Sequence, residues 1–200
     1  HFYPETAAED TNCCVSNHGY NGYRRTAFLI TDMSDFMVDC SGSLLVFHGA
    51  MNAFIVRRCE NIVLKGFNIL FSKTLHGQFV VTASENDYVD ITQDGEQGYV
   101  YENGLLYLEN EQEFRNLVYT CEEIQPNGEY VYGEQCFGKD FLYLKNEDRG
   151  NGTIRIYNPP RKPDKGNYVV LLAAERYANA VLLLESKNVS VSDCCVYSSF

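Results

Sequence analysis

The sequence predicts an all-β protein in which a right-handed parallel β-helix carries an inserted small antiparallel β-barrel or sandwich domain. Three observations support this fold class: a widely spaced repeat of short strands, a central region of short strands separated by Asn and Gly turns, and very little helical periodicity. The 200 residues are 45% hydrophobic and 14% aromatic, which suffices for a sizeable core and excludes a disordered chain.

The repeat joins residues 54–69 to residues 181–196, which lie 127 positions further along the chain. In both segments a short apolar strand runs into a small residue, then an Asn one position later, and then alternating apolar positions. Residues 29–39 are a weaker third copy, offset by 26 residues from the first segment, with Asp35 at the Asn position. The alternation predicts that these side chains point inward: Ile55, Ile62, Leu64, Ile69, Val189, Val191 and Val196.

A repeat of about 20 to 30 residues built from short strands cannot bury its apolar face alone, so it must stack on neighbouring copies. The parallel β-helix meets that requirement. Asn61 and Asn188 suit a tight bend, because the Asn side chain bonds nearby backbone groups and tolerates a positive φ. We therefore expect the two residues to stack as a ladder with a structural role.

The residues between the two main copies do not continue the repeat. Asn103–Gly104 lies between two strand-like runs, which is a strong hairpin signal. Further expected strands are 79–83, 88–92, 129–132, 141–144 and 153–157, and the one expected short helix is 110–117. We predict an exposed loop over 158–164. The expected organisation is an N-terminal cap and first β-helix coils over 1–78, an inserted antiparallel domain over 79–172, and a resumed coil over 173–200.

Charge and cysteine spacing exclude several classes of function. Acidic residues number 27 and basic residues 16, and the resulting charge of -11 would repel nucleic acid and anionic lipid. No apolar run reaches the roughly 18 to 20 residues that span a bilayer. The eight cysteines and four histidines lack zinc-ligand spacing, so no metal and no other cofactor is expected. The cysteines fit either a disulfide framework or small buried apolar side chains, and we favour the second.

Several segments resemble the N-terminal part of glycoside hydrolase family 110, whose members are bacterial exo-acting α-galactosidases, including enzymes that remove terminal α-1,3-linked galactose. The segments that carry the resemblance are His1–Glu5, Val15–His18, Arg25–Phe28, Val38–Ser43, Phe47–Gly49 and Glu60–Phe67. The resemblance implies a secreted protein, periplasmic or extracellular, that acts on a terminal α-galactoside. It also implies inverting hydrolysis by two carboxyl groups, which in such enzymes lie about 6.5 to 9.5 Å apart.

The family's catalytic carboxylates lie in a later segment that contains an Asp-Asp pair, and this sequence has no Asp-Asp pair. No catalytic residue is therefore carried over. The chain is expected to be an N-terminal fragment or a truncated relative that is inactive alone. The local acid pairs are interpreted as solvated surface charges: Glu122 with Glu123, Asp32 with Asp35, and Glu109 with Glu111.

Five polar residues next to the ends of coils are candidates for substrate binding: His18, Arg24, Arg25, His48 and His76. They would either line a groove or cap the open first coil. The alternative function is a non-catalytic β-helix that binds carbohydrate or another surface. Self-association through the open end at residues 196–200 is a further expectation, because this end carries no Pro or charge to protect its edge.

Overall fold

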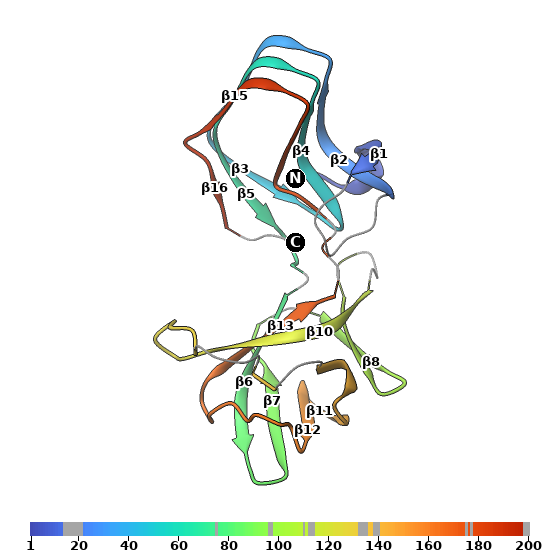
Figure 1. Cartoon of the computed structure of the whole chain (residues 1–200), viewed down its shortest axis with the longest axis vertical. Helices are drawn as coiled ribbons and strands as arrows, with labels where there is room; N and C mark the ends of the chain where they lie inside the picture. The colour runs from blue at the N-terminus through green and yellow to red at the C-terminus, as the bar shows by residue number, and fades with distance from the viewer. Residues whose placement is uncertain are drawn as a thin grey trace. The chain divides into compact units, whose positions relative to one another are not determined.

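A computed structural model describes residues 1–13, 22–74, 76–95, 98–109, 111, 115–131, 136–137, 141–174, 176 and 178–197. The chain is all-β and divides into two compact units. One comprises His1–Thr74 with Arg176–Phe200, and the other comprises Leu75–Glu175 (Figure 1). No helix in the described part of the chain is long and apolar enough to cross a membrane.

The first unit contains three successive layers of chain, which we call rungs. The first rung is residues 22–47, the second 51–71 and the third 181–196. Their strands are β2 (Gly22–Thr31), β3 (Ser34–Phe47), β4 (Met51–Arg57), β5 (Glu60–Phe71), β14 (Val181–Leu184), β15 (Lys187–Ser192) and β16 (Cys195–Val196). Strands β2, β4 and β14 form one parallel sheet, and β5 pairs in parallel with β3 on one side and with β15 and β16 on the other (Figure 1).

The register of these parallel pairs is the one that the repeat predicts. Phe54 pairs with Val181, and Ile62 pairs with both Phe36 and Val189. Since a slip of one residue would turn every side chain to the opposite face, the apolar alternation and the strand pairing specify each other. The alignment of residues 29–39, 54–69 and 181–196 is confirmed at the level of single residues.

The wide spacing of the second and third rungs comes from the second unit. The 127-residue offset between paired positions contains the 101 residues of Leu75–Glu175, and 26 residues remain without them. The offset between the first and second rungs is also 26 residues, from Leu29 to Ile55. The chain therefore leaves the stack and returns to it without a change in the length of one rung.

Each rung turns between its two sheets through two residues with positive φ, which are Asp32 and Asp35, Arg58 and Asn61, or Glu185 and Asn188. Asp35, Asn61 and Asn188 have φ of 55°, 57° and 52°. The Asn61 Nδ2 donates to Asp35 Oδ1 at 2.9 Å, and the Asn188 Nδ2 donates to Asn61 Oδ1 at 3.0 Å. The predicted ladder is confirmed, and it continues into the first rung through Asp35.

The core of the first unit contains aromatic rings that pack from rung to rung. The Phe54 ring stacks on Phe28 with centroids 4.5 Å apart, and on Phe67 at 4.8 Å. On the first rung, the Phe2 ring meets the edge of Phe28 at 4.9 Å. Such pairs contribute about 0.5–1.5 kcal/mol each beyond the burial of their area.

Four of the residues predicted to point inward have no exposed surface: Ile55, Ile62, Leu64 and Ile69. On the third rung, however, Val189 is half-buried, Val191 is 42% exposed and Val196 is 45% exposed. Val191 occupies the same register position as Leu64. The difference arises because no described residue stacks on the outer side of the third rung.

The second unit is an antiparallel sheet of eight strands, nearly closed and barrel-like, in the order β11-β12-β7-β6-β13-β10-β9-β8. The strands are β6 (His76–Ser84), β7 (Tyr88–Gln93), β8 (Gly98–Glu102), β9 (Leu105–Glu109), β10 (Arg115–Ile124), β11 (Asn146–Gly150), β12 (Thr153–Tyr157) and β13 (Tyr168–Ala173). Asn103 and Gly104 form the predicted hairpin turn with φ of 53° and 79°. Both values are positive, as a tight two-residue hairpin requires.

Three local predictions in this unit need correction. The segment expected to be helical, 110–117, contains the start of β10 from Arg115, because pairing with β9 outweighs the local pattern. The strand expected over 141–144 is a 3-10 helix, Phe141–Tyr143. Within 129–132, Tyr130 makes an isolated bridge to Ile124, and residue 132 lies outside the described residues.

The first prediction compares two positions in one register. Leu64→Ala should cost about 2–5 kcal/mol in unfolding free energy, because it removes buried methyl groups and leaves a cavity. Val191→Ala, at the matching exposed position, should cost less than about 1 kcal/mol. Urea denaturation of the 200-residue chain measures both values, and equal costs would contradict the assigned rungs.

The second prediction separates the backbone and side-chain roles of Asn61. Asn61→Gly keeps the left-handed backbone accessible and loses only the amide contacts with Asp35 and Asn188. Asn61→Ala loses the same contacts and also carries the strain of a Cβ at positive φ. The Ala variant should therefore be less stable than the Gly variant by about 1 kcal/mol in the same denaturation assay. An Ala variant as stable as the Gly variant would show that φ does not constrain this corner.

Candidate functional site

Residues 1–13 lie along the strand edges of the first rung. The Phe2 N–H donates to the Val46 carbonyl at 2.8 Å, and the His48 N–H donates to the Phe2 carbonyl at 2.9 Å. A 3-10 turn, η1 (Pro4–Thr6), follows, and β1 (Ala8–Cys13) then pairs antiparallel with β2. These contacts supply partners to backbone groups that the first rung would otherwise leave at an open edge.

His48 belongs to a cluster of aromatic rings at the end of β3. Its ring stacks on Tyr3, with centroids 4.3 Å apart and planes at 11°, and its Nε2 lies 2.9 Å from Nδ1 of His1. In a hydrogen bond between two imidazoles one ring nitrogen donates and the other accepts, and the tautomers decide which. Tyr3 is 47% exposed. The cluster thus offers an aromatic ring and two imidazoles near the surface.

The two arginines of the candidate set are consecutive residues of β2, so their side chains point to opposite faces of the strand. Arg25 forms an ion pair with Glu9 at 3.0 Å and donates to the Ala7 carbonyl at 3.3 Å. Arg24 donates to the Tyr23 carbonyl at 3.2 Å. The contacts of Arg25 attach the N-terminal segment to β2, as a capping residue would.

The structure divides the rest of the candidate set. His48 lies in the first unit with the two arginines, whereas His76 begins β6 in the second unit. His18 lies outside the described residues. The sequence missed Tyr3, His1 and Glu9 as neighbours of the set, because they are far from it along the chain.

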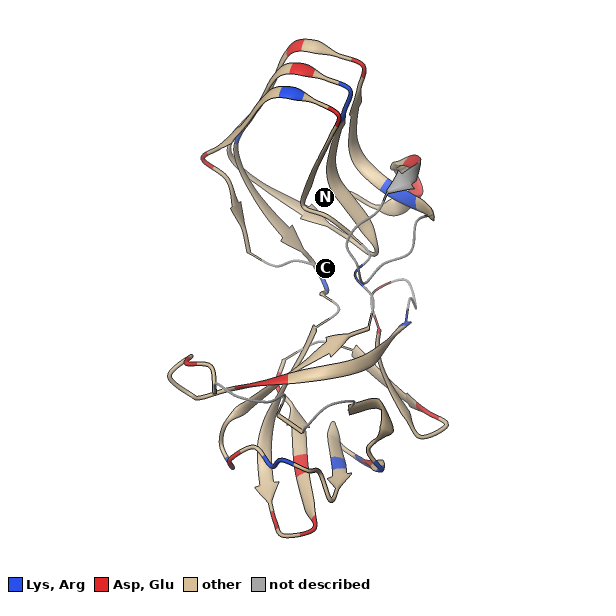
Figure 2. Ribbon diagram, in the orientation of Figure 1, with Lys and Arg blue, Asp and Glu red and all other residues tan. Residues whose placement is uncertain are grey.

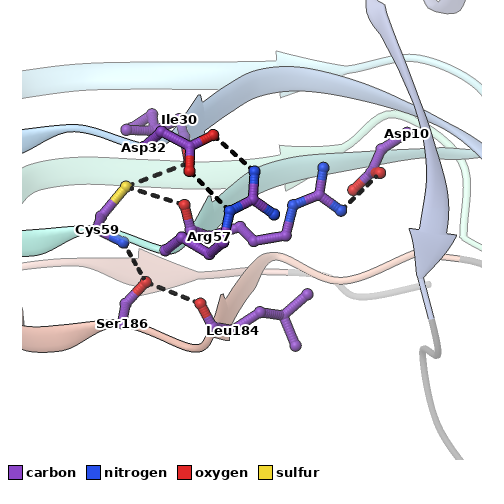
Figure 3. A network of polar contacts seen from close by, with 8 residues as sticks. Asp10, Ile30, Asp32, Arg57, Cys59, Leu184 and Ser186 are labelled. Atoms are coloured by element: carbon purple, nitrogen blue, oxygen red, sulfur yellow. Dashed lines mark hydrogen bonds and ion pairs between the residues drawn. The ribbon is translucent and has the colours of Figure 1, made fainter.

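A second group of polar contacts lies where the rungs turn into their second sheet, and charged residues of both signs occur there (Figure 2). Arg58 donates to both carboxylate oxygens of Asp32, at 2.7 and 2.6 Å. These hydrogen bonds lower the pKa of Asp32 and raise the pKa of Arg58. Nearby, Arg57 pairs at 3.0 Å with the buried Asp10 (Figure 3).

The small residues of the second and third rungs, Cys59 and Ser186, have a clear role in this network. The single hydrogen of the buried Cys59 thiol has two carbonyl acceptors within reach, that of Arg57 at 3.2 Å and that of Ile30 at 3.5 Å from the sulfur (Figure 3). The Cys59 N–H donates to the Ser186 hydroxyl oxygen at 3.0 Å, and that hydroxyl donates to the Leu184 carbonyl at 2.8 Å. The residue joins the three rungs through backbone groups, which is a structural function.

A groove of about 520 Å³ lies on the first rung between β2 and β3. Its lining residues are Ala27, Phe28, Leu29, Ile30, Phe36, Met37, Val38 and Asp39. Asp39 is the one carboxylate among them. It accepts hydrogen bonds from the Ser41 hydroxyl at 2.6 Å and the Ser41 N–H at 3.1 Å, and it pairs with Lys65 at 3.0 Å. These donors lower the pKa of Asp39 to about 2.

The interpretation of the acid pairs as surface charges is wrong for Glu123. This residue is 3% exposed and accepts hydrogen bonds from Arg161 at 2.7 Å, Asn167 at 2.7 Å and the Asp164 N–H at 2.9 Å. Glu123 is buried because residues 161–167 fold over β10. Asp32 and Asp35 are exposed, as the interpretation requires.

Comparison with known proteins shows what the chain is similar to. No protein-family model matches it. It is 25% identical to alpha-1,3-galactosidase B of Bacteroides thetaiotaomicron over 173 residues, which are 84% of this chain and 28% of that protein. It is 27% identical to alpha-1,3-galactosidase A of Shewanella woodyi over 192 residues, which are 92% of this chain and 31% of that protein. A third relative, alpha-1,3-galactosidase B of Phocaeicola vulgatus, is 25% identical over 98% of this chain and 32% of its own length.

These similarities relate the chain to the α-galactosidase-like glycoside hydrolases. More particularly, the chain is similar to the N-terminal portion of glycoside hydrolase family 110 proteins. It spans about a third of the length of these curated relatives.

The third prediction concerns acid stability at Asp39. Because its pKa is about 2 in the folded chain and 3.8 without these partners, its contribution to stability is complete above pH 3.8 and is lost as the pH falls through 2. Stability measured by denaturation should therefore fall between pH 5 and pH 2 by more in the unmodified chain than in Asp39→Asn. Ser41→Ala removes the donor that lowers this pKa most, so it should also reduce the pH dependence. If both variants lost as much stability as the unmodified chain, Asp39 would not be the responsible group.

Proposed function

We propose that the chain is the N-terminal part of an exo-acting α-galactosidase-like glycoside hydrolase, and that its first unit is the start of a right-handed parallel β-helix with the second unit inserted. The observation that carries the proposal is similarity to alpha-1,3-galactosidases over most of the chain. The three rungs in parallel register support the β-helix, because they bury a continuous core only by stacking. The proposed substrate is a terminal α-galactoside, and the proposed location is periplasmic or extracellular.

We also propose that residues 1–200 lack the catalytic pair. An inverting glycosidase needs one carboxyl group with a raised pKa as general acid and a second carboxylate as base. The pKa values of Asp32, Asp39 and Glu147 are instead lowered, in each case mainly by a hydrogen bond from a neighbouring side chain. The buried Glu123 is held by an arginine and two further donors. Each of these four carboxyl groups is hydrogen-bonded to neighbouring residues of the fold.

The N-terminal portion would then serve the whole enzyme as a cap and foundation for the later rungs. Phe2 and β1 pair with the strand edges of the first rung, and Arg25 attaches β1 to β2. A role in substrate binding for the set of His18, Arg24, Arg25, His48 and His76 remains part of the proposal. Self-association through the exposed third rung also stays a prediction.

The alternative function, a non-catalytic carbohydrate-binding module, is favoured by one specific observation. Tyr3 and His48 present stacked rings at the surface, and aromatic faces with a few polar groups are typical of sites that bind small ligands. The two functions differ in what the 200-residue chain does alone.

The fourth prediction tests the two functions. With p-nitrophenyl α-D-galactoside, the 200-residue chain should release no more nitrophenol than a buffer blank, because the proposal assigns the catalytic carboxyl pair to no residue of this chain. Turnover by this chain that a single Asp or Glu substitution within residues 1–200 abolishes would contradict the proposal. A longer protein that contains these residues should hydrolyse the substrate, and Asp39→Asn in it should leave the turnover rate per folded molecule within about twofold.

Titration of the chain with methyl α-D-galactoside, followed by NMR chemical shifts, tests the alternative. Binding that is lost in Tyr3→Ala and retained in Tyr143→Ala would favour the carbohydrate-binding module. Tyr143 is the matched control because it is 79% exposed and lies in the second unit.

A further inference from the structure

Two cysteines of the second unit face each other in its core. Cys121 lies in the middle of β10 and has no exposed surface, and Cys136 is 1% exposed. Their sulfur atoms are 2.8 Å apart, and the Cys136 N–H lies 3.5 Å from the Cys121 carbonyl oxygen. Because backbone and side chain of one residue both approach the other, the two positions are held together by the fold.

We propose that Cys121 and Cys136 form a disulfide bond in the mature protein. A disulfide has an S–S distance of about 2.04 Å, so the two sulfurs need to approach by less than about 1 Å. Small rotations of the two side chains suffice for this movement. The proposal is independent of the galactosidase activity, because it depends on the core of the second unit alone.

The other buried cysteine with described contacts differs from this pair. Cys59 has backbone carbonyls of two rungs within reach as acceptors for its thiol hydrogen. Cys121 and Cys136 have each other as their sulfur partners. The preference for free buried cysteines therefore describes Cys59 well, and the pair calls for the disulfide interpretation.

The bond would join β10 to the chain just before Phe137. It closes a loop across residues 122–135, and the buried ring of Phe137 lies 5.7 Å from that of Phe141 in the 3-10 helix η2 (Phe141–Tyr143). A disulfide across a loop of this length restricts the unfolded chain and so favours the folded state.

The chemistry requires an oxidant, and a disulfide reagent of the glutathione class supplies it. Cys121 and Cys136 each lose a proton and together two electrons as the S–S bond forms, and the S–S bond of the reagent is reduced to two thiols. The exchange proceeds through a thiolate. Contact with Cys121 and burial both raise the pKa of Cys136 in the folded chain, so the bond should form during folding, before the pair is enclosed. The enclosed bond should then resist reduction until the second unit opens.

Peptide mass spectrometry tests the bond without any variant. The 200-residue chain is refolded with oxidised glutathione, then denatured and alkylated without reductant. The expected result is one linked pair of peptides containing Cys121 and Cys136, 2 Da lighter than the two thiol peptides together, with Cys59 alkylated. Alkylation of both Cys121 and Cys136, or a link from either one to another cysteine, would overturn the proposal.

Thermal unfolding supplies the second measurement, with Cys59→Ala as the control. Reduction under denaturing conditions followed by refolding should lower the Tm of the unmodified chain and of Cys59→Ala by roughly 5–10 °C. The Tm of Cys121→Ala/Cys136→Ala should not change with reduction. A Tm of the unmodified chain that is the same in the oxidised and reduced preparations would also contradict the proposal.

Discussion

The first unit depends on the repetition of one turn. Each rung passes from one sheet to the other through two residues in the left-handed conformation, and side-chain hydrogen bonds link the second of them from Asp35 through Asn61 to Asn188. Once the turns stand above one another, the strands that follow must pair in parallel and in one register. In that register the phenylalanine rings stack on one another, and Asp32 of the first rung lies beside Arg58 of the second. The hydrogen bonds at the turn therefore set the geometry in which the apolar core can close.

The second unit separates two strands that pair with each other. The chain leaves the stack after Thr74 and returns at Arg176, so β14 must find its place on β4 after 101 intervening residues. The repeated residues specify this pairing, because Asn188 hydrogen-bonds to Asn61 and Ser186 hydrogen-bonds to Cys59 on the second rung. The second unit has its own buried core, which includes Phe79, Ile91 and Leu171.

The sequence predicted the register of the rungs because both the turn residues and the apolar alternation repeat at fixed positions. It also predicted the Asn103–Gly104 hairpin, whose signal is local. Other features depend on partners that lie far along the chain. Glu123 is buried by residues 161–167. Val191 is exposed because no rung among the described residues covers it. Of the candidate site, Arg25 and His48 lie in the first unit, but their partners Glu9 and Tyr3 come from pairing across the sheet edge, which no local pattern encodes.

A surface built from successive rungs places side chains at regular intervals. A protein built in this way can extend its binding surface by adding rungs. The measurement that tests the account most directly is therefore the register between the second and third rungs. In an isotopically labelled sample, nuclear Overhauser contacts should join the backbone protons of Val63 and Leu64 to those of Ser190 and Val191, as the pairing of β5 with β15 requires. Contacts displaced by one residue, or no contacts between these strands, would contradict the account.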